Sequence, residues 1–291
     1  MDDITLERRP IATGSAPCAA NSVLIRGTRL DLNELVDRQF FQPERMVTLR
    51  AQLQAAAPFP HLVIEGLFNP TLLNLTLEEF EMCEWTEMRS GYESTRRMAL
   101  GSRMGPASQL YFDIVNSGWY TTWVGSITGV PYLLTDPLLF GGGLHETRPG
   151  SAFGVHRDFE RHRHVGLHNA MVMITYLNKG WQPQWGSALE LWDAQRQHCV
   201  TRVQPEFGHT LFMPHNAVSF HGHPDPLNTP DGRPRRSLTA YYYTNSDAGT
   251  VREDQVSSLF LHMSRLDRVK RVARMIAPPL LWSAARKFAR R

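Results

Sequence analysis

The strongest constraint on the fold is a series of short apolar or alternating segments between residues 137 and 246. Turn signals such as Arg148-Pro149-Gly150 and Asn178-Lys179-Gly180 separate them, because proline and glycine supply fixed or positive φ angles. Short strands at such spacing are typical of a β-sandwich or barrel. We predict about eight strands, at 138–145, 153–158, 171–177, 188–192, 199–203, 210–213, 217–221 and 237–244.

Helical patterns precede this β-rich region. The apolar run 61–64 is a predicted strand, and Asn69-Pro70 after it opens a helix through Glu81. A second helix is predicted over 108–127. The chain therefore reads as mainly β with flanking helices, a jelly roll within one domain overall. We predict an irregular N-terminal arm in 1–60, a helical support region in 61–136, the β core in 137–246 and a basic helical tail in 247–291.

Composition fits a globular protein with a full core. The chain has 291 residues, of which 42% are hydrophobic. Its three cysteines are odd in number and show no C-x-x-C spacing, so neither a disulfide framework nor a zinc ribbon is expected. The sequence also shows no signal peptide and no apolar run of about 18 residues. These features predict a soluble, cytoplasmic protein.

The net charge of +3 hides a basic C-terminus. Residues 264–291 carry nine Lys/Arg against the single acid Asp267, a net of +8, which leaves −5 for the remainder. No nucleic-acid-binding signature is found, so no nucleic-acid partner is expected. Two interpretations of the tail stay open. It is either a docked terminal helix with a solvated basic face or a weak contact with an anionic membrane surface.

A set of metal ligands is indicated by His156-Arg157-Asp158. On an extended strand, residues i and i+2 point to the same face, so His156 and Asp158 can converge on one ion. His221, at the end of a later apolar segment, supplies a third ligand. Two histidines and one carboxylate leave coordination positions open, which lets iron(II) bind an organic acid and dioxygen together.

An arginine after the third ligand indicates an anion-binding site. His223-Pro224-Asp225 also matches His-x-Asp, but only His156 and Asp158 are followed by another histidine and then by Arg235-Arg236-Ser237. A guanidinium at this strand can bind a carboxylate through two parallel hydrogen bonds. Arg235 is the predicted residue. Arg236 is the alternative, because it faces the opposite side of the strand.

These residues resemble the iron(II)- and 2-oxoglutarate-dependent dioxygenases of the prolyl-hydroxylase-like group. The resemblance covers about residues 138–244. It rests on six ordered blocks: Gly141-Gly142-Gly143-Leu144-His145, His156-Arg157-Asp158-Phe159, Tyr176-Leu177-Asn178-Lys179-Gly180-Trp181, Trp185-Gly186-Ser187-Ala188-Leu189-Glu190-Leu191-Trp192-Asp193, Phe220-His221-Gly222-His223-Pro224 and Arg235-Arg236-Ser237-Leu238-Thr239.

The resemblance implies a double-stranded β-helix of the cupin-like kind and an enzyme that uses O2. It would convert 2-oxoglutarate to succinate and CO2 while hydroxylating an unactivated C–H bond of a small molecule or of an amino-acid or peptidyl substrate. His156, Asp158 and His221 would bind iron(II) and act in catalysis together with Arg235. The co-substrate 2-oxoglutarate would bind to Arg235, Tyr176 and Ser237, and ascorbate is a further reductant that the resemblance allows.

Some features leave alternatives. Ser187 stands where such proteins often have a second glycine, so the turn before residue 188 is expected to differ. His145 and His223 suit a structural role as well as a functional one. Two other classes of function remain: a non-catalytic β-sandwich that binds a metabolite or sugar, and a peripheral membrane protein that acts through its tail. A halogenase is disfavoured, because Asp158 occupies the position that halide would need.

Overall fold

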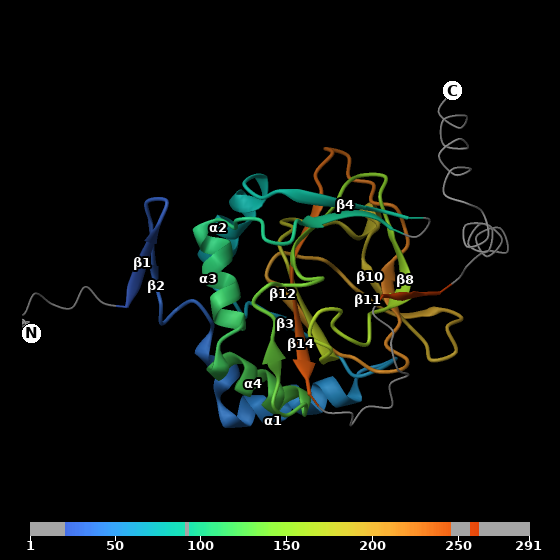
Figure 1. Ribbon diagram of the computed structural model, residues 1–291, viewed down its shortest axis with the longest axis horizontal. Coiled ribbons are helices and arrows are strands. Elements are labelled where there is room, and N and C mark those ends of the chain that lie inside the picture. Colours follow the sequence, from blue (N-terminus) through green and yellow to red (C-terminus); the bar gives the residue numbers. More distant parts are fainter. Residues whose placement is uncertain (1–20, 91–92, 246–256, 262–291) are drawn as a thin grey trace, which may run out of the picture.

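Two antiparallel sheets form the centre of the protein (Figure 1). The computed structural model describes residues 21–90, 93–245 and 257–261. Within them the central strands are β7 (Gly143–Thr147), β8 (Phe153–Arg157), β9 (His168–Tyr176), β10 (Leu189–Trp192), β11 (Cys199–Val203), β12 (His209–Pro214), β13 (His221–His223) and β14 (Arg235–Thr244).

The order of these strands defines the architecture. The larger sheet contains the run β12-β9-β14-β7, and the smaller sheet contains β11-β10-β13-β8. The chain crosses between the sheets at every connection in this series except the one from β10 to β11. Repeated crossing of this kind makes a jelly roll. The predicted fold class, a double-stranded β-helix with flanking helices, is therefore confirmed.

Side chains of the larger sheet divide between two hydrophobic cores. Val172 and Tyr176 of β9 pack between the sheets, together with Leu189 of the smaller sheet. Their neighbours Met171 and Met173 belong to a second core that includes helical residues. The division follows from the two-residue period of a strand. It leaves the inner face of the roll free to carry a site while the outer face supports the helices.

Four helices lie together on one side of the roll (Figure 1). They are α1 (Pro43–Ala55), α2 (Pro70–Glu78), α3 (Pro106–Val115) and α4 (Gly118–Thr128), with short 3-10 turns at Arg38–Phe41, Glu79–Glu81 and Pro183–Trp185. The Asn69 side chain caps α2 by accepting a hydrogen bond from the Thr71 N–H. The Tyr242 hydroxyl of β14 donates to the Val115 carbonyl at 2.9 Å, which joins α3 to the larger sheet. No helix in the described ranges is both long and apolar enough to span a bilayer.

The predicted irregular arm in 1–60 is wrong for the part that the structure describes. Strands β1 (Ser22–Ile25) and β2 (Thr28–Asp31) form a hairpin, and α1 follows. The hairpin turn has positive φ at both Arg26 and Gly27. Such a turn is usually predicted from Asn-Gly or Asp-Gly, and neither pair is present here. Helix α1 buries only Leu49 and Leu53, so it has almost no apolar stripe to recognise.

The strand predicted at 61–64 is present as β3 (Leu62–Glu65), but the predicted helical region 61–136 also contains strands that were not predicted. They are β4 (Trp85–Arg89), β5 (Ser94–Met98) and β6 (Leu134–Thr135). Hairpin β4-β5 extends the larger sheet beside β7. Its sequence is polar on both faces and therefore lacks the alternation of a half-buried strand. The helix predicted over 108–127 is two helices, because Ser117 is extended between them.

Boundaries in the predicted core and tail also change. Strand β7 begins at Gly143 rather than 138, because Leu139 and Gly141 have positive φ and form a turn. Residues 217–220 are not a strand, and β13 starts at His221. In the tail, β15 (Leu259–Phe260) is a strand that pairs with β8. The rest of the predicted tail helix lies outside the described residues.

Candidate active site

The three predicted metal ligands converge inside the roll. His156 lies in β8, Asp158 follows that strand, and His221 begins β13. The two strands are antiparallel neighbours with His221 opposite His156. One ligand atom from each side chain lies within 4.8 Å of the others, and all three residues are buried. The structure therefore brings together the set that the His-x-Asp spacing predicted.

A close approach of two strands positions His221. At Gly222 of β13 an added Cβ would lie 2.8 Å from the Gly154 carbonyl oxygen, a distance that real side chains do not reach. Strand β8 carries an extra residue here, because His221 pairs with His156 while His223 pairs with Phe153. This bulge and the absence of a side chain at Gly222 allow the imidazoles of His156 and His221 to lie next to each other.

Backbone carbonyls orient both imidazoles. Nδ1 of His156 lies 2.9 Å from the Gly154 oxygen, and Nδ1 of His221 lies 3.0 Å from the Ser219 oxygen. A carbonyl oxygen only accepts, so each Nδ1 carries a proton and donates it. The Nε2 atoms then turn toward Asp158, at 3.3 Å for His156 and 3.6 Å for His221. This is the orientation that metal-binding histidines use.

The charges in this cluster call for a cation. Burial lowers the pKa of His221 to about 4, although Asp158 opposes the shift. Burial alone would raise the pKa of Asp158, but His221 and His156 hold it below its usual range. The Asp158 carboxylate is therefore stabilised by a positive charge beside it. His221 does not supply that charge, because burial keeps its imidazole from taking a second proton. A divalent metal ion held by the three side chains would supply that charge, and two histidines with one carboxylate suit iron(II).

At the other end of the site, Arg235 is a buried cation that has no acidic partner among the described residues. It lies at the start of β14, and its Cζ is 5.0 Å from the centre of the Tyr176 ring. The Arg235 Nε and the Tyr176 hydroxyl are both buried without a hydrogen-bond partner among the described residues. Burial also lowers the pKa of Arg235. Open donors on a buried charge are costly, so the pair is suited to an anion that enters from outside the chain.

Arg236 faces the other side of β14. Its Nε lies 2.9 Å from Glu146 Oε2, and its guanidinium also pairs with Glu81. Neighbouring strand residues point to opposite faces. Of the two arginines that the sequence offered, Arg235 is the one that lines the same cavity as the three metal ligands.

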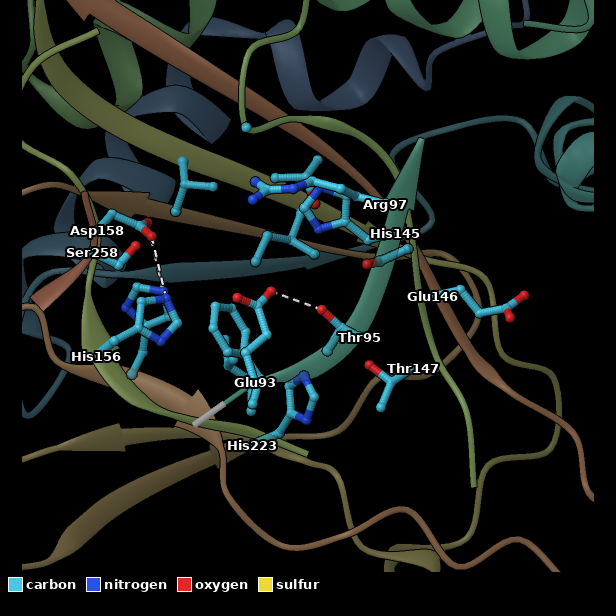
Figure 2. A pocket seen from close by; sticks show the side chains of 18 of the residues that line it. Glu93, Thr95, Arg97, His145, Glu146, Thr147, His156, Asp158, His223 and Ser258 are labelled. Carbon is cyan, nitrogen blue, oxygen red and sulfur yellow. Dashed lines mark hydrogen bonds and ion pairs between the residues drawn. The ribbon is translucent and has the colours of Figure 1, made fainter. Parts of the chain in front are cut away.

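One cavity of about 110 Å³ joins the two ends of the site (Figure 2). Ser237 lines it two residues beyond Arg235, and His145 and His223 line it as well. The His223 Nδ1 lies 3.1 Å from the Ser187 Oγ. Ser187 has φ +57°, so the position expected to hold glycine keeps the left-handed backbone, and its hydroxyl contacts a cavity residue.

Sequence reasoning missed the part of the cavity wall that the β5 segment contributes. Glu93, Thr95 and Arg97 come from β5 and the residue before it, and Figure 2 shows them across the cavity from His156 and Asp158. They were hidden by the assignment of residues 61–136 to helices. The sequence carried no local signal for this strand, because all five residues from Glu93 to Arg97 are polar and show no apolar alternation.

Comparison with known proteins agrees with this geometry. Residues 142–243 match the model of the 2OG-Fe(II) oxygenase superfamily. No curated protein matches the chain. Solved structures with a similar fold include a Pseudomonas putida prolyl-4-hydroxylase, at 20% identity over 68% of this chain and 100% of that one, with a TM-score of 0.47. Another is a Trichoplax adhaerens prolyl hydroxylase in complex with a hypoxia inducible factor peptide fragment. It is 13% identical over 70% of this chain and 92% of that one, with a TM-score of 0.49.

A third similar structure is HygX from Streptomyces hygroscopicus with nickel and 2-oxoglutarate bound, 12% identical over 77% of this chain and 97% of that one, with a TM-score of 0.47. The fold assignment rests on the strand order, and the family assignment rests on the match to residues 142–243. Residues 142–243 thus carry a 2OG-Fe(II) oxygenase domain. The chain is an enzyme of the dioxygenase class, and this superfamily uses iron(II), 2-oxoglutarate and O2 to oxidise a substrate.

Proposed function

We propose that this chain is a hydroxylase in which His156, Asp158 and His221 bind iron(II) and Arg235 binds the distal carboxylate of 2-oxoglutarate. One observation carries the proposal. A single cavity has metal-ligand atoms at one end and the unpartnered donors of Arg235 and Tyr176 near the other. A 2-oxo acid with a second carboxylate fits both ends, because one end chelates a metal and the other accepts hydrogen bonds.

Tyr176 and Ser237 complete the proposed carboxylate site. They are register partners on β9 and β14, so their side chains lie side by side on one face. Burial raises the pKa of Tyr176, which keeps its hydroxyl protonated and able to donate. With the fork of Arg235, the site offers a charge-assisted contact and two hydroxyl donors.

Iron(II), when bound, supplies the centre at which O2 and 2-oxoglutarate react. In the balanced reaction, 2-oxoglutarate loses CO2 and becomes succinate with one oxygen atom of O2, while the other oxygen atom enters a substrate C–H bond. The four electrons that reduce O2 come equally from the oxo acid and from the C–H bond. The chain orients both ligands, and the apolar walls Val172, Ile174 and Leu189 limit water in the cavity.

Succinate formation tests the proposal. Anaerobically purified protein is given iron(II), 2-oxoglutarate and then O2, and succinate is measured with and without candidate substrates, alongside a mass-spectrometric search for products that have gained one oxygen atom. We expect succinate from the iron-loaded protein and none after chelation. Iron binding without any consumption of 2-oxoglutarate would instead favour the non-catalytic binding protein.

The substrate is proposed to be a small molecule or an amino-acid or peptidyl compound, and ascorbate stays a prediction from the resemblance. We also propose a cytoplasmic location, which is supported by the free thiols of Cys83 and Cys199.

Contact of the basic tail with an anionic membrane stays a prediction, because residues 262–291 lie outside the described ranges. Charge reversal at Arg268, Lys270, Arg271 and Arg274 would weaken binding to anionic vesicles by about 1 kcal/mol per residue if the tail makes that contact. Negligible vesicle binding by both proteins would leave the docked helix.

A further inference from the structure

A groove of about 470 Å³ opens onto the metal cavity. Five residues line both spaces, and they therefore mark the passage between them: Glu93, Arg97, Gly141, Phe159 and Ser258. If the proposed function holds, a substrate reaches iron past this passage. Two of the five carry opposite charges, and both come from the β5 segment.

The charges of β5 are used differently on its two faces. Arg96 points outward, where its Nη2 lies 2.6 Å from Glu146 Oε1. Arg97 points inward, and in the described part of the chain its guanidinium has no hydrogen bond or ion pair. The Glu93 carboxylate accepts a hydrogen bond from Thr95 Oγ1 at 2.8 Å and pairs with no cation among the same residues. Glu93 and Arg97 are not paired with each other either.

These two charges lie on different sides of the metal ligands. Glu93 forms a backbone bridge with Phe153, whose ring is 4.0 Å from that of His156. Arg97 is the register partner of His145, and its charge also acts on Tyr241, which lies beside Asp158. Figure 2 shows the Glu93 and Arg97 side chains extending from the hairpin toward His156 and Asp158. A molecule between them would lie over the metal site.

Arg97 is also separate from the proposed 2-oxoglutarate anchor. In the sheet, Arg97 pairs with His145 of β7, and His145 pairs with Ser237 of β14. Two strand spacings of about 4.8 Å put the Arg97 backbone roughly 10 Å from that of Ser237. Arg235 lies a further two residues along β14. The distal carboxylate that Arg235 binds therefore leaves Arg97 free for a second anion.

We infer that the substrate is a free, zwitterionic amino-acid-like molecule whose carboxylate binds Arg97 and whose ammonium group binds Glu93. This inference rests on the proposed function and names its substrate class. A residue inside a peptide has neither charge on its backbone, so it would leave both side chains unpaired. The remainder of the molecule would be apolar, because the groove walls include Met88, Leu100, Leu138, Leu139, Phe140 and Phe260.

A matched set of probes tests the inference. Leucine, isoleucine, methionine, phenylalanine and proline are each compared with their carboxamide, N-acetyl and N-acetyl-amide forms, and succinate above the substrate-free rate is measured together with the oxygenated product. At least one free amino acid should be hydroxylated. Loss of either charge should lower its kcat/KM by about ten- to a hundredfold.

Equal or better turnover of an N-acetyl amide would overturn the inference in favour of a peptidyl substrate. So would a failure of every free amino acid to raise succinate above the substrate-free rate. Substrate-free succinate formation separates these outcomes from failure of the proposed function, since without a hydroxylase active site it would be absent as well.

Variants then assign each charge to its residue. In Arg97→Gln the preference for the free acid over its carboxamide should collapse, and in Glu93→Gln the preference for the free amine over its N-acetyl form should collapse. Arg97→Lys should restore part of the first preference. Arg89→Gln is the control, because this arginine of the same hairpin is 77% exposed and lines neither space.

Two results would contradict the assignment. One is an unchanged preference in both Gln variants. The other is a rise in the KM for 2-oxoglutarate in Arg97→Gln as large as that in Arg235→Gln, which would make Arg97 a second anchor for the co-substrate.

Discussion

The two faces of the larger sheet use the same residue type in opposite ways. On the outer face, Arg96 and Arg236 both pair with Glu146, which lies between them on β7. On the inner face, their neighbours Arg97 and Arg235 have no acid partner among the described residues. A shift of one residue along a strand thus separates an arginine with an ion pair from one without.

This difference separates stability from binding. The outer pairs join β5, β7 and β14 through one buried carboxylate, so removing it leaves Arg96 without this counter-ion and Arg236 with only the exposed Glu81. The inner guanidiniums have open donors that contribute only when an anion arrives. Substitutions on the outer face should therefore lower the free energy of unfolding, and those on the inner face should change ligand binding with little loss of stability.

The largest effect is expected at the metal ligands on the inner side of the roll. His156→Ala, Asp158→Ala and His221→Ala should each abolish turnover and iron binding, because each removes a ligand without cutting a large apolar core. Iron content and succinate formation are measured on the same samples. His198→Ala, at a 69% exposed side chain, is the control. Near-wild-type iron affinity in any of the three variants would make that ligand assignment wrong.

On the outer face, Glu146→Gln should cost about 3–5 kcal/mol in the free energy of unfolding, the usual range when one partner of a buried ion pair is removed. The Glu146 side chain is 2% exposed, and those of Arg96 and Arg236 are 12% and 17% exposed. Glu81→Gln is the matched control. It removes a 71% exposed partner of Arg236 and should cost less than about 1 kcal/mol. The free energy of unfolding is measured in urea. Equal and small decreases in Glu146→Gln and Glu81→Gln would show that the outer ion pairs do not stabilise the sheet.

The two neighbouring arginines of β14 give the sharpest contrast. Arg235→Ala should raise the KM for 2-oxoglutarate about ten- to a hundredfold, which corresponds to a lost charge-assisted contact of roughly 1.5–3 kcal/mol. Arg236→Ala should change this KM little. Arg235→Lys should recover only part of the affinity for 2-oxoglutarate that Arg235→Ala loses, because lysine offers a point donor instead of a planar fork. A larger KM defect in Arg236→Ala would reverse the assignment of the two faces.

A smaller effect is expected where β13 approaches β8. Gly222→Ala adds a Cβ 2.8 Å from the Gly154 oxygen, so the strands must separate and His221 must move away from His156. Overpacking of this kind costs about 1–3 kcal/mol. We expect about tenfold weaker iron binding. Gly118→Ala is the control, because nothing lies within 4 Å of its added Cβ. Equal iron affinity in the two variants would show that the close approach does not position His221.

Much of this contrast could be predicted from the sequence. The two-residue period of a strand put His156 and Asp158 on one face and Arg235 and Arg236 on opposite faces. The strands of the roll were recognised because their apolar segments end at Pro and Gly turns. Those signals are local, and local spacing is what a single sequence displays.

The missing parts depend on long-range contacts. Hairpin β4-β5 buries ion pairs and cavity residues instead of an apolar stripe. Its place in the site depends on long-range contacts such as the one between Arg96 and Glu146, which are 50 residues apart in the sequence. Helix α1 was missed for a similar reason, because it buries just Leu49 and Leu53. Strand β15 is two residues long, and its place beside His156 follows from pairing with β8.

Anaerobic titration of 2-oxoglutarate into the iron(II)-loaded protein tests the central claim most directly. A 2-oxo acid that chelates iron(II) produces a visible charge-transfer absorption, so metal binding and co-substrate binding are read in one experiment. The account predicts this absorption in the wild type at one 2-oxoglutarate per chain, its loss in His221→Ala, a need for about ten- to a hundredfold more 2-oxoglutarate in Arg235→Ala, and little change in Arg236→Ala. No absorption in the iron-loaded wild type, or equal affinity in the two arginine variants, would contradict it.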